Sequence, residues 1–290
     1  RNLVASDAFV FGPGGLLQNE TGIWNLPYHL RRLGSVRRAG IPWAGIGLGA
    51  DGLITDRGRS RVRRTLVGHT AIAVRDEPSA EALRALGVDR VVRAADLAFL
   101  AEPPTVSRDG VLGVCLRAPQ SGRLRPGALD AGRTWPDERA AALAAALDDT
   151  CQATGLTTRF VALDALADGM VHRQVADRMA TPVEVVEPDL EGVMGALARV
   201  DAVATMRYHG AVLAALGGAA VVALPHSPKL RSLAADLGPG APVHDGEADG
   251  LAAAVSGVLA GQSHLAEAVD RLRTLAGRNV EVLDGLLGAA

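Results

Sequence analysis

The chain has 290 residues, of which 48% are hydrophobic, which is enough for one large or two ordinary globular domains. Thirty basic and 32 acidic side chains give a net charge of −2, and only 3% of residues are aromatic, which excludes a chain-wide nucleic-acid-binding surface. The longest apolar run, from Gly210 to Leu224, has 15 residues, fewer than the roughly 20 that a membrane-spanning helix needs.

Short apolar or β-branched runs alternate with longer segments of helical periodicity along the chain. Strands are predicted within residues 5–12, 41–48, 69–75, 88–94, 110–118, 158–164, 182–187, 200–206, 219–225 and 241–245. Helices are predicted at 136–154 and 190–199, and a long closing helix at His264 to about Leu287. Strands that alternate with helices in this way predict an α/β protein with doubly wound parallel sheets.

Proline and glycine in 100–111 mark a linker, and a second loop follows at 119–136. These breaks predict an N-terminal half of residues 1–105 and a C-terminal half of residues 106–290, with the closing helix crossing back over both. The chain enters a strand almost directly after Arg1, so we expect the N-terminal half to be incomplete. No secretory signal is visible, which favours the cytoplasm. Cys115 and Cys151 have no metal or redox spacing, and we expect buried free thiols.

The segment MRYHG, from Met206 to Gly210, lies where a predicted buried strand meets a predicted buried helix. Ligands of open α/β sheets bind beyond the carboxyl ends of strands, so we expect Arg207 and His209 to project into a crevice. Residues 202–235 contain no Asp or Glu, and their basic residues favour a phosphate or carboxylate ligand. The alternative is that Arg207 pairs locally and His209 only begins a helix. An Arg207 guanidinium held against a buried carboxylate would contradict the anion site.

Other candidates are less specific. The glycine-rich segment 11–22 follows the first strand and offers Gly14, Gly15, Gln18, Asn19 and Glu20 to a sugar, although a purely structural turn is an equally good interpretation. Arg117 ends a predicted strand and could complete a carboxylate clamp. Arg75 also ends a strand, but the adjacent Asp76 and Glu77 could neutralise it. The arginine run from Arg57 to Arg64 is interpreted as a solvated helix face.

Several of these segments together resemble the polysaccharide pyruvyl transferases. The matching segments are FGPGGLLQNET, AGIGLG, VRDEPSAEALRALGV, AADLAFL and, as the most specific, ATMRYHGAVLAALGGAAVVALPHSPK. The resemblance implies two Rossmann-like halves in a GT-B-like architecture. It also implies transfer of a pyruvyl group from phosphoenolpyruvate to a cell-wall or exopolysaccharide sugar as a cyclic ketal. The family usually has Tyr and Asp where this chain has His226 and Ser227, although Lys229 is retained.

The resemblance assigns roles to the candidate residues. Arg207, Lys229 and Arg117 would hold the phosphate and carboxylate of phosphoenolpyruvate, and His209 would deliver a proton to its methylene carbon. Glu20 is the hypothetical base for the acceptor hydroxyl. The remaining substrate-binding candidates are Gly14, Gly15, Gln18, Asn19 and His226. No cofactor and no metal are expected, since no Cys, His and carboxylate cluster has ligand spacing.

Two alternative functions remain open. The first is a GT-B glycosyltransferase that uses a nucleotide sugar, although the acid-free segment 202–235 lacks the pair of glutamates that retaining members commonly use. The second is a non-catalytic relative that binds an anionic glycan. A lipid-linked acceptor would require peripheral contact with the inner face of a membrane, and the run from Arg57 to Arg64 is the segment that could assist.

Overall fold

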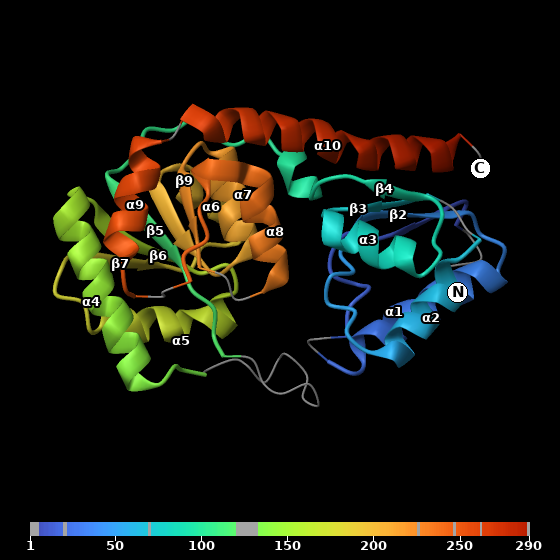
Figure 1. Cartoon of the computed structure of the whole chain (residues 1–290), viewed down its shortest axis with the longest axis horizontal. Coiled ribbons are helices and arrows are strands. Elements are labelled where there is room, and N and C mark those ends of the chain that lie inside the picture. The colour runs from blue at the N-terminus through green and yellow to red at the C-terminus, as the bar shows by residue number, and fades with distance from the viewer. Residues whose placement is uncertain are drawn as a thin grey trace. The chain divides into compact units, whose positions relative to one another are not determined.

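The computed structural model describes residues 6–19, 22–68, 71–119, 133–224, 227–245, 248–261 and 263–288. Within them the chain forms two compact units. Unit 1 contains the residues up to Leu100 and those from Arg271 onward, and unit 2 contains the described residues from Ala101 to Asp270 (Figure 1). The final helix therefore begins in unit 2 and ends in unit 1.

Unit 1 is built on a parallel sheet with the strand order β1-β2-β3-β4. Its elements are β1 (Phe9–Phe11), α1 (Asn25–Arg38), β2 (Trp43–Leu48), α2 (Asp56–Leu66), β3 (Ile72–Val74), α3 (Glu77–Ala85), β4 (Val91–Arg93) and the later part of α10 (Ser263–Leu287). Successive side chains of a strand point to opposite faces, and β3 shows the result. Ile72 and Val74 pack with the core under α1 to α3, whereas Ala73 packs with α10.

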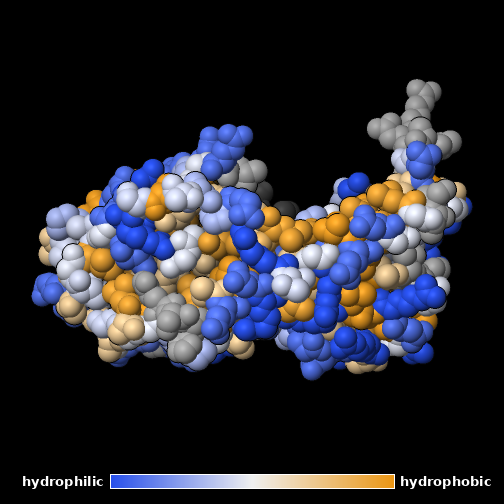
Figure 2. Space-filling model, turned by 90° about the horizontal axis from the view of Figure 1, so that it is seen from above, coloured by the Kyte–Doolittle hydropathy of each residue, from blue (hydrophilic) through white to orange (hydrophobic). Residues whose placement is uncertain are grey.

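The later part of α10 is joined to unit 1 by a buried asparagine. Asn279 Oδ1 accepts a hydrogen bond from Gly47 N at 2.7 Å, and its Nδ2 donates to Ala95 O at 3.0 Å. Val282 and Leu286, one and two turns further on, cover Ala44 and Ala73 of the sheet. Figure 2 views the side on which α10 lies, where hydrophilic residues in blue alternate with hydrophobic residues in orange.

Unit 2 is built on a parallel sheet with the strand order β7-β6-β5-β8-β9. Its elements are β5 (Val111–Cys115), α4 (Asp137–Thr154), β6 (Thr157–Val161), α5 (Ala165–Ala176), β7 (Val183–Val186), α6 (Leu190–Ala198), β8 (Ala202–Thr205), α7 (Tyr208–Leu216), β9 (Ala220–Ala223), α8 (Pro228–Leu237), α9 (Leu251–Ala260) and the start of α10. The chain winds outward from β5 to β7 and then returns to β8 on the other side of β5. This Rossmann-like order places the topological switch point between β5 and β8.

The sequence-based prediction of a doubly wound α/β protein is confirmed. Helices cover both faces of the unit 2 sheet, since α4 packs with α5 and α9, and α7 packs with α6 and α8. Nine of the ten predicted strands form. The tenth, at 241–245, contributes only an isolated bridge between Val243 and Ala223. Both cysteines are buried free thiols, as expected.

The apolar run from Gly210 to Leu224 forms the rest of α7, a turn and β9, and almost all of it is buried. A glycine turn therefore divides the run before it reaches the length of a bilayer. In the described part of the chain, no helix combines the length and apolar character that crossing a membrane requires.

Candidate active site

The switch point of unit 2 brings together the loops that follow β5 and β8. The two strands are paired from Leu112 to Cys115, and the pairing continues where Met206 N donates to Cys115 O at 2.8 Å. Arg117 lies in the loop after β5, and Arg207 and His209 lie in and after the loop that follows β8. The sequence-based prediction that MRYHG joins a strand to a helix is confirmed.

Thr205, at the end of β8, shapes the turn into α7. Its Oγ1 accepts a hydrogen bond from Arg207 N and donates one to Arg207 O, both at 2.9 Å. Gly210 lets the first turn of α7 pack against the strands, since a Cβ there would lie 2.6 Å from Thr205 Oγ1 and 3.2 Å from Cys115 Sγ. The turn and the close packing together present Arg207 and His209 at the carboxyl edge of the sheet.

Arg207 forms an ion pair with Asp168 of α5. Its Nε donates to Asp168 Oδ2 at 2.8 Å, and its Nη2 donates to Asp168 Oδ1. The Asp168 side chain is fully buried and that of Arg207 is 20% exposed. The condition stated from the sequence is therefore met, and the prediction that Arg207 itself binds the anion is wrong. The linear stretch 202–235 does lack acids, but a carboxylate from another element reaches Arg207 in the fold.

Asp168 and His172 lie in the candidate site, and the sequence-based reasoning missed them. They lie four residues apart, hence on one face of α5, and both hold the loop after β5. Leu116 N donates to His172 Nε2 at 3.0 Å, and Ala118 N donates to Asp168 Oδ1 at 3.4 Å. Asp168 therefore connects the loop that carries Arg117 with the loop that carries Arg207. The sequence did contain one indication of them, since Asp168 and His172 are polar residues spaced four apart in a segment of helical periodicity.

The buried groups at this edge have shifted protonation equilibria. Burial raises the pKa of the Asp168 carboxyl, although the Arg207 guanidinium opposes the shift. Burial lowers the pKa of His172 to about 4, so this side chain is neutral near pH 7. Burial raises the pKa of Cys115 to about 12, which keeps it a thiol and removes it as a candidate nucleophile.

The first turns of α7 and α8 form the electropositive part of the site. Neither helix has an acidic residue in its first turn, and neither N-cap side chain, Arg207 or Ser227, caps its helix. Lys229 Nζ lies 6.0 Å from the centre of the Tyr208 ring, which places the two helix starts next to each other. His209 is exposed and Lys229 is half-buried. Two positive helix ends with a lysine and a histidine favour an anion.

The glycine-rich segment lies in unit 1 and has a structural purpose. Gly12 has φ +134°, and a Cβ on it would lie 2.0 Å from Ile46 O, so only glycine permits this approach to β2. Gly14 N donates to Gly47 O at 3.0 Å, which extends the sheet past the end of β1. Gly15 and Gln18 continue this segment, and their role in binding a sugar stays a prediction.

Asn19 is also part of this segment and is 7% exposed. Its Oδ1 accepts a hydrogen bond from Ile54 N at 3.0 Å, and its Nδ2 donates to Thr55 Oγ1 at 2.5 Å. These contacts hold the turn that leads into α2. Glu20 and His226, the other two candidates, lie outside the described residues.

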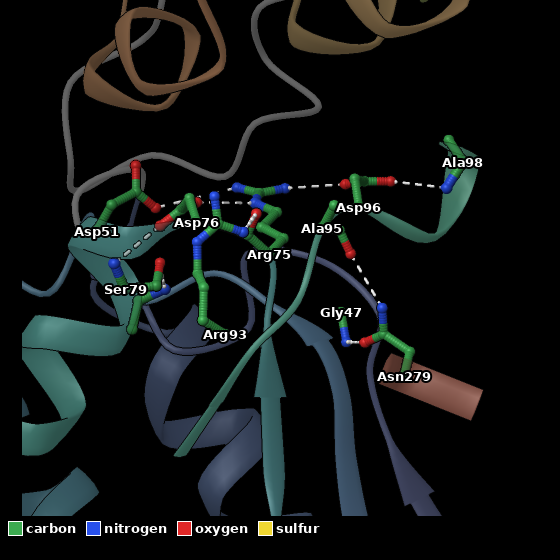
Figure 3. A network of polar contacts seen from close by, with 11 residues as sticks. Gly47, Asp51, Arg75, Asp76, Ser79, Arg93, Ala95, Asp96, Ala98 and Asn279 are labelled. Carbon is green, nitrogen blue, oxygen red and sulfur yellow. Dashed lines mark hydrogen bonds and ion pairs between the residues drawn. The ribbon is translucent and has the colours of Figure 1, made fainter. Parts of the chain in front are cut away.

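Arg75 is not an anion clamp. Its side chain is 4% exposed and lies among three carboxylates, those of Asp51, Asp76 and Asp96, at 3.4 to 3.9 Å (Figure 3). The neutralisation by Asp76 considered from the sequence is thus supported, whereas Glu77 pairs with Arg84 and Arg93 instead. The other two acids come from segments distant in sequence. Among the described residues, no group of three or more His, Cys, Asp and Glu side chains is placed to hold a metal ion.

Comparison with sequence families shows the family to which the chain belongs. A sequence model of the polysaccharide pyruvyl transferase family matches residues 1–228, a span that includes both sheets and the loops of the candidate site. The chain belongs to this family, which confirms the resemblance stated from the segments above. A comparison with curated protein sequences finds no significant match.

Solved structures similar to this chain are GT-B glycosyltransferases and epimerases. A putative UDP-N-acetylglucosamine 2-epimerase from Listeria monocytogenes is 10% identical, with a TM-score of 0.61, over 90% of this chain and 72% of that one. Anabaena Alr3699/HepE with UDP and glucose is 15% identical, with a TM-score of 0.54, over 91% and 76%. A mutant of S. aureus TarM in complex with UDP is 11% identical, with a TM-score of 0.55, over 90% and 53%. The chain spans about half the length of the TarM structures. The likeness shows a GT-B-like fold.

Proposed function

We propose that the chain transfers a pyruvyl group from phosphoenolpyruvate to a sugar of a cell-wall glycan or exopolysaccharide as a cyclic ketal. The observation that carries this proposal is the electropositive edge of unit 2, formed by the starts of α7 and α8 with His209 and Lys229, in a member of the pyruvyl transferase family. Phosphoenolpyruvate is a compact anion with a phosphate and a carboxylate, and such a ligand suits this edge.

The reaction requires one proton delivery and two attacks on the same carbon. A proton is added to the methylene carbon, a sugar hydroxyl attacks the neighbouring carbon, and the bond from that carbon to the phosphate oxygen breaks. A second hydroxyl of the sugar then closes the ring. One hydroxyl proton balances the proton added to the methylene, and the other leaves with phosphate. His209 is exposed and is proposed as the acid.

The cationic residues have different roles in this proposal. Lys229 and Arg117 bind the phosphate and carboxylate, and the positive ends of α7 and α8 add to the attraction. Arg207 is proposed as a positioning residue, because Asp168 already engages its Nε and Nη2. The Arg207–Asp168 pair fixes the turn that presents His209. Glu20 remains the proposed base for the acceptor hydroxyl.

The test combines donor consumption with product mass. The chain is incubated with phosphoenolpyruvate and a panel of N-acetylhexosamine glycosides, and phosphate release and the mass gain of one ketal are measured. We expect His209→Ala to lower kcat by about 10²- to 10⁴-fold. Lys229→Ala should raise KM for phosphoenolpyruvate about 10-fold or more, since it removes a charged hydrogen bond.

Arg231→Ala is the matched control. Arg231 lies two residues after Lys229 on α8, is 52% exposed and pairs with the exposed Asp245. Its removal should leave kcat and KM close to wild type. Unchanged ketal formation in His209→Ala and Lys229→Ala would disprove this site. Hydrolysis of a nucleotide sugar without consumption of phosphoenolpyruvate would establish the glycosyltransferase alternative, to which the fold likeness corresponds.

A further inference from the structure

The exposed side of α1 and α2 in unit 1 carries a concentration of positive charge. The two helices contain nine arginines and a single acidic residue, Asp56, although the whole chain has a net charge of −2. Seven of these arginines are exposed, and we refer to them together as the arginine-rich face: Arg31, Arg32, Arg38, Arg57, Arg59, Arg63 and Arg64. The helices pack side by side (Figure 1). Such charge asymmetry in an otherwise acidic chain points to an anionic partner.

Large apolar side chains border the arginine-rich face at the start of both helices. This apolar rim consists of Ile23, Trp24, Tyr28 and Ile54, with exposed fractions of 42%, 73%, 57% and 49%. Ile23 and Trp24 directly precede α1, and Ile54 precedes the N-cap of α2. Both helices follow parallel strands, so their first turns lie at the same edge of the sheet.

A cavity of about 490 Å³ lies between the apolar rim and the arginines of α2. Ile23 and Trp24 line it from one side, and Arg57 and Arg61 line it from α2. Guanidinium groups therefore lie beside exposed aromatic and aliphatic side chains around one opening. A nucleic acid is the less suitable partner, because its phosphate backbone would not bury the exposed side chains of Ile23 and Ile54. At a bilayer, apolar and aromatic side chains enter the interface while arginines meet anionic headgroups.

We propose that the arginine-rich face and the apolar rim dock unit 1 on an anionic lipid bilayer. The contact is peripheral: Trp24, Ile23 and Ile54 enter the headgroup region, and the arginines of α1 and α2 supply the electrostatic attraction. The inference is independent of the donor substrate. The arginine run of α2, for which the sequence left open a solvated helix face or contact with a membrane, thereby has a partner of defined chemistry.

Trp24 supplies a direct optical readout. The chain has three tryptophans, and Trp43 and Trp135 are each 4% exposed, whereas Trp24 is 73% exposed. The full chain is mixed with phosphatidylglycerol-containing vesicles or with phosphatidylcholine vesicles, and co-sedimentation and tryptophan emission are measured. We expect binding and a blue shift with the anionic vesicles, weakening as salt is added. Trp24→Phe should retain binding but lose the blue shift.

Charge-reversal variants distinguish binding by α1 and α2 from an effect of the net charge of the chain. Arg57→Glu with Arg61→Glu should lower binding to anionic vesicles about tenfold or more. Arg84→Glu with Arg90→Glu changes the net charge equally at two exposed arginines of unit 1 outside α1 and α2, and should retain most of the binding. Equal losses in both double variants, absence of vesicle binding, or a blue shift that persists in Trp24→Phe would overturn the proposal. So would binding to an RNA oligonucleotide in preference to the anionic vesicles.

Discussion

At the residue scale, the candidate site depends on buried polar side chains that hold its loops in place. His172 is fully buried and its Nε2 accepts a hydrogen bond from Leu116 N, so the neutral imidazole is the form that fits. Asp168 likewise accepts from Ala118 N and from Arg207. Each side chain joins a helix to a loop of the switch point. The geometry of the candidate site is therefore sensitive to the protonation of these two buried side chains.

His172 makes the stability of the protein depend on pH. Its pKa is about 4 in the folded protein against an ordinary 6.5, so the unfolded chain binds the extra proton in this window. The stabilisation is complete above pH 6.5 and is lost as the pH falls toward 4, by up to about 3 kcal/mol. His172→Gln retains an acceptor for Leu116 N without a titrating ring. Urea unfolding should show a shallower pH dependence for the variant, and parallel curves would contradict the prediction.

At the scale of elements, the start of α7 is set by its contact with β5 and β8. Thr205 Oγ1 makes two hydrogen bonds to the backbone of Arg207, and these bonds fix its position. A methyl group at position 210 would meet this oxygen at 2.6 Å. The helix would have to shift away from the strands, and His209 would move with it.

Gly210→Ala should therefore lower both stability and the proposed transfer activity. We expect a loss of about 1–3 kcal/mol in the free energy of unfolding, as for overpacking of a core. Gly257→Ala in α9 is the control, because Gly257 is exposed and a Cβ there meets no atom within 4 Å. That change should stabilise the protein by about 0.5–1 kcal/mol. Denaturant unfolding and ketal formation measure the two effects, and equal behaviour of the two variants would disprove the packing argument.

At the scale of the whole molecule, unit 1 is not a continuous stretch of chain. The sequence predicted an N-terminal half of residues 1–105 with the closing helix crossing back over both halves, and the residues of that helix from Arg271 onward belong to the same compact unit. They cover the face of the sheet that carries Ala44 and Ala73, and they supply Asn279 to the backbone of Gly47. A chain cut after the linker would leave this face open to water.

Removal of residues 271–290 should destabilise unit 1 selectively. Hydrogen exchange should show loss of protection in β2 and β3 while β5 and β8 of unit 2 stay protected. Asn279→Leu is the milder test and should cost about 2–4 kcal/mol, since Gly47 N and Ala95 O lose their partner. Asp284→Ala, an exposed position on the same helix, should be near neutral. Unaltered protection of β2 in the truncated chain would contradict this account.

The local elements could be predicted from the sequence, because strand and helix periodicities are properties of adjacent residues. It predicted nine of the strands, the junction at MRYHG, the burial of Cys115 and Cys151, and the family through its contiguous segments. The partners of the charged and polar groups could not be predicted, because they come together only in the folded chain. Asp168 reaches Arg207 across 39 positions, and Asn279 reaches Gly47 across 232. Ion pairing and burial depend on distances in space. The residues adjacent to Arg207 in the sequence therefore cannot show that a carboxylate from α5 pairs with it.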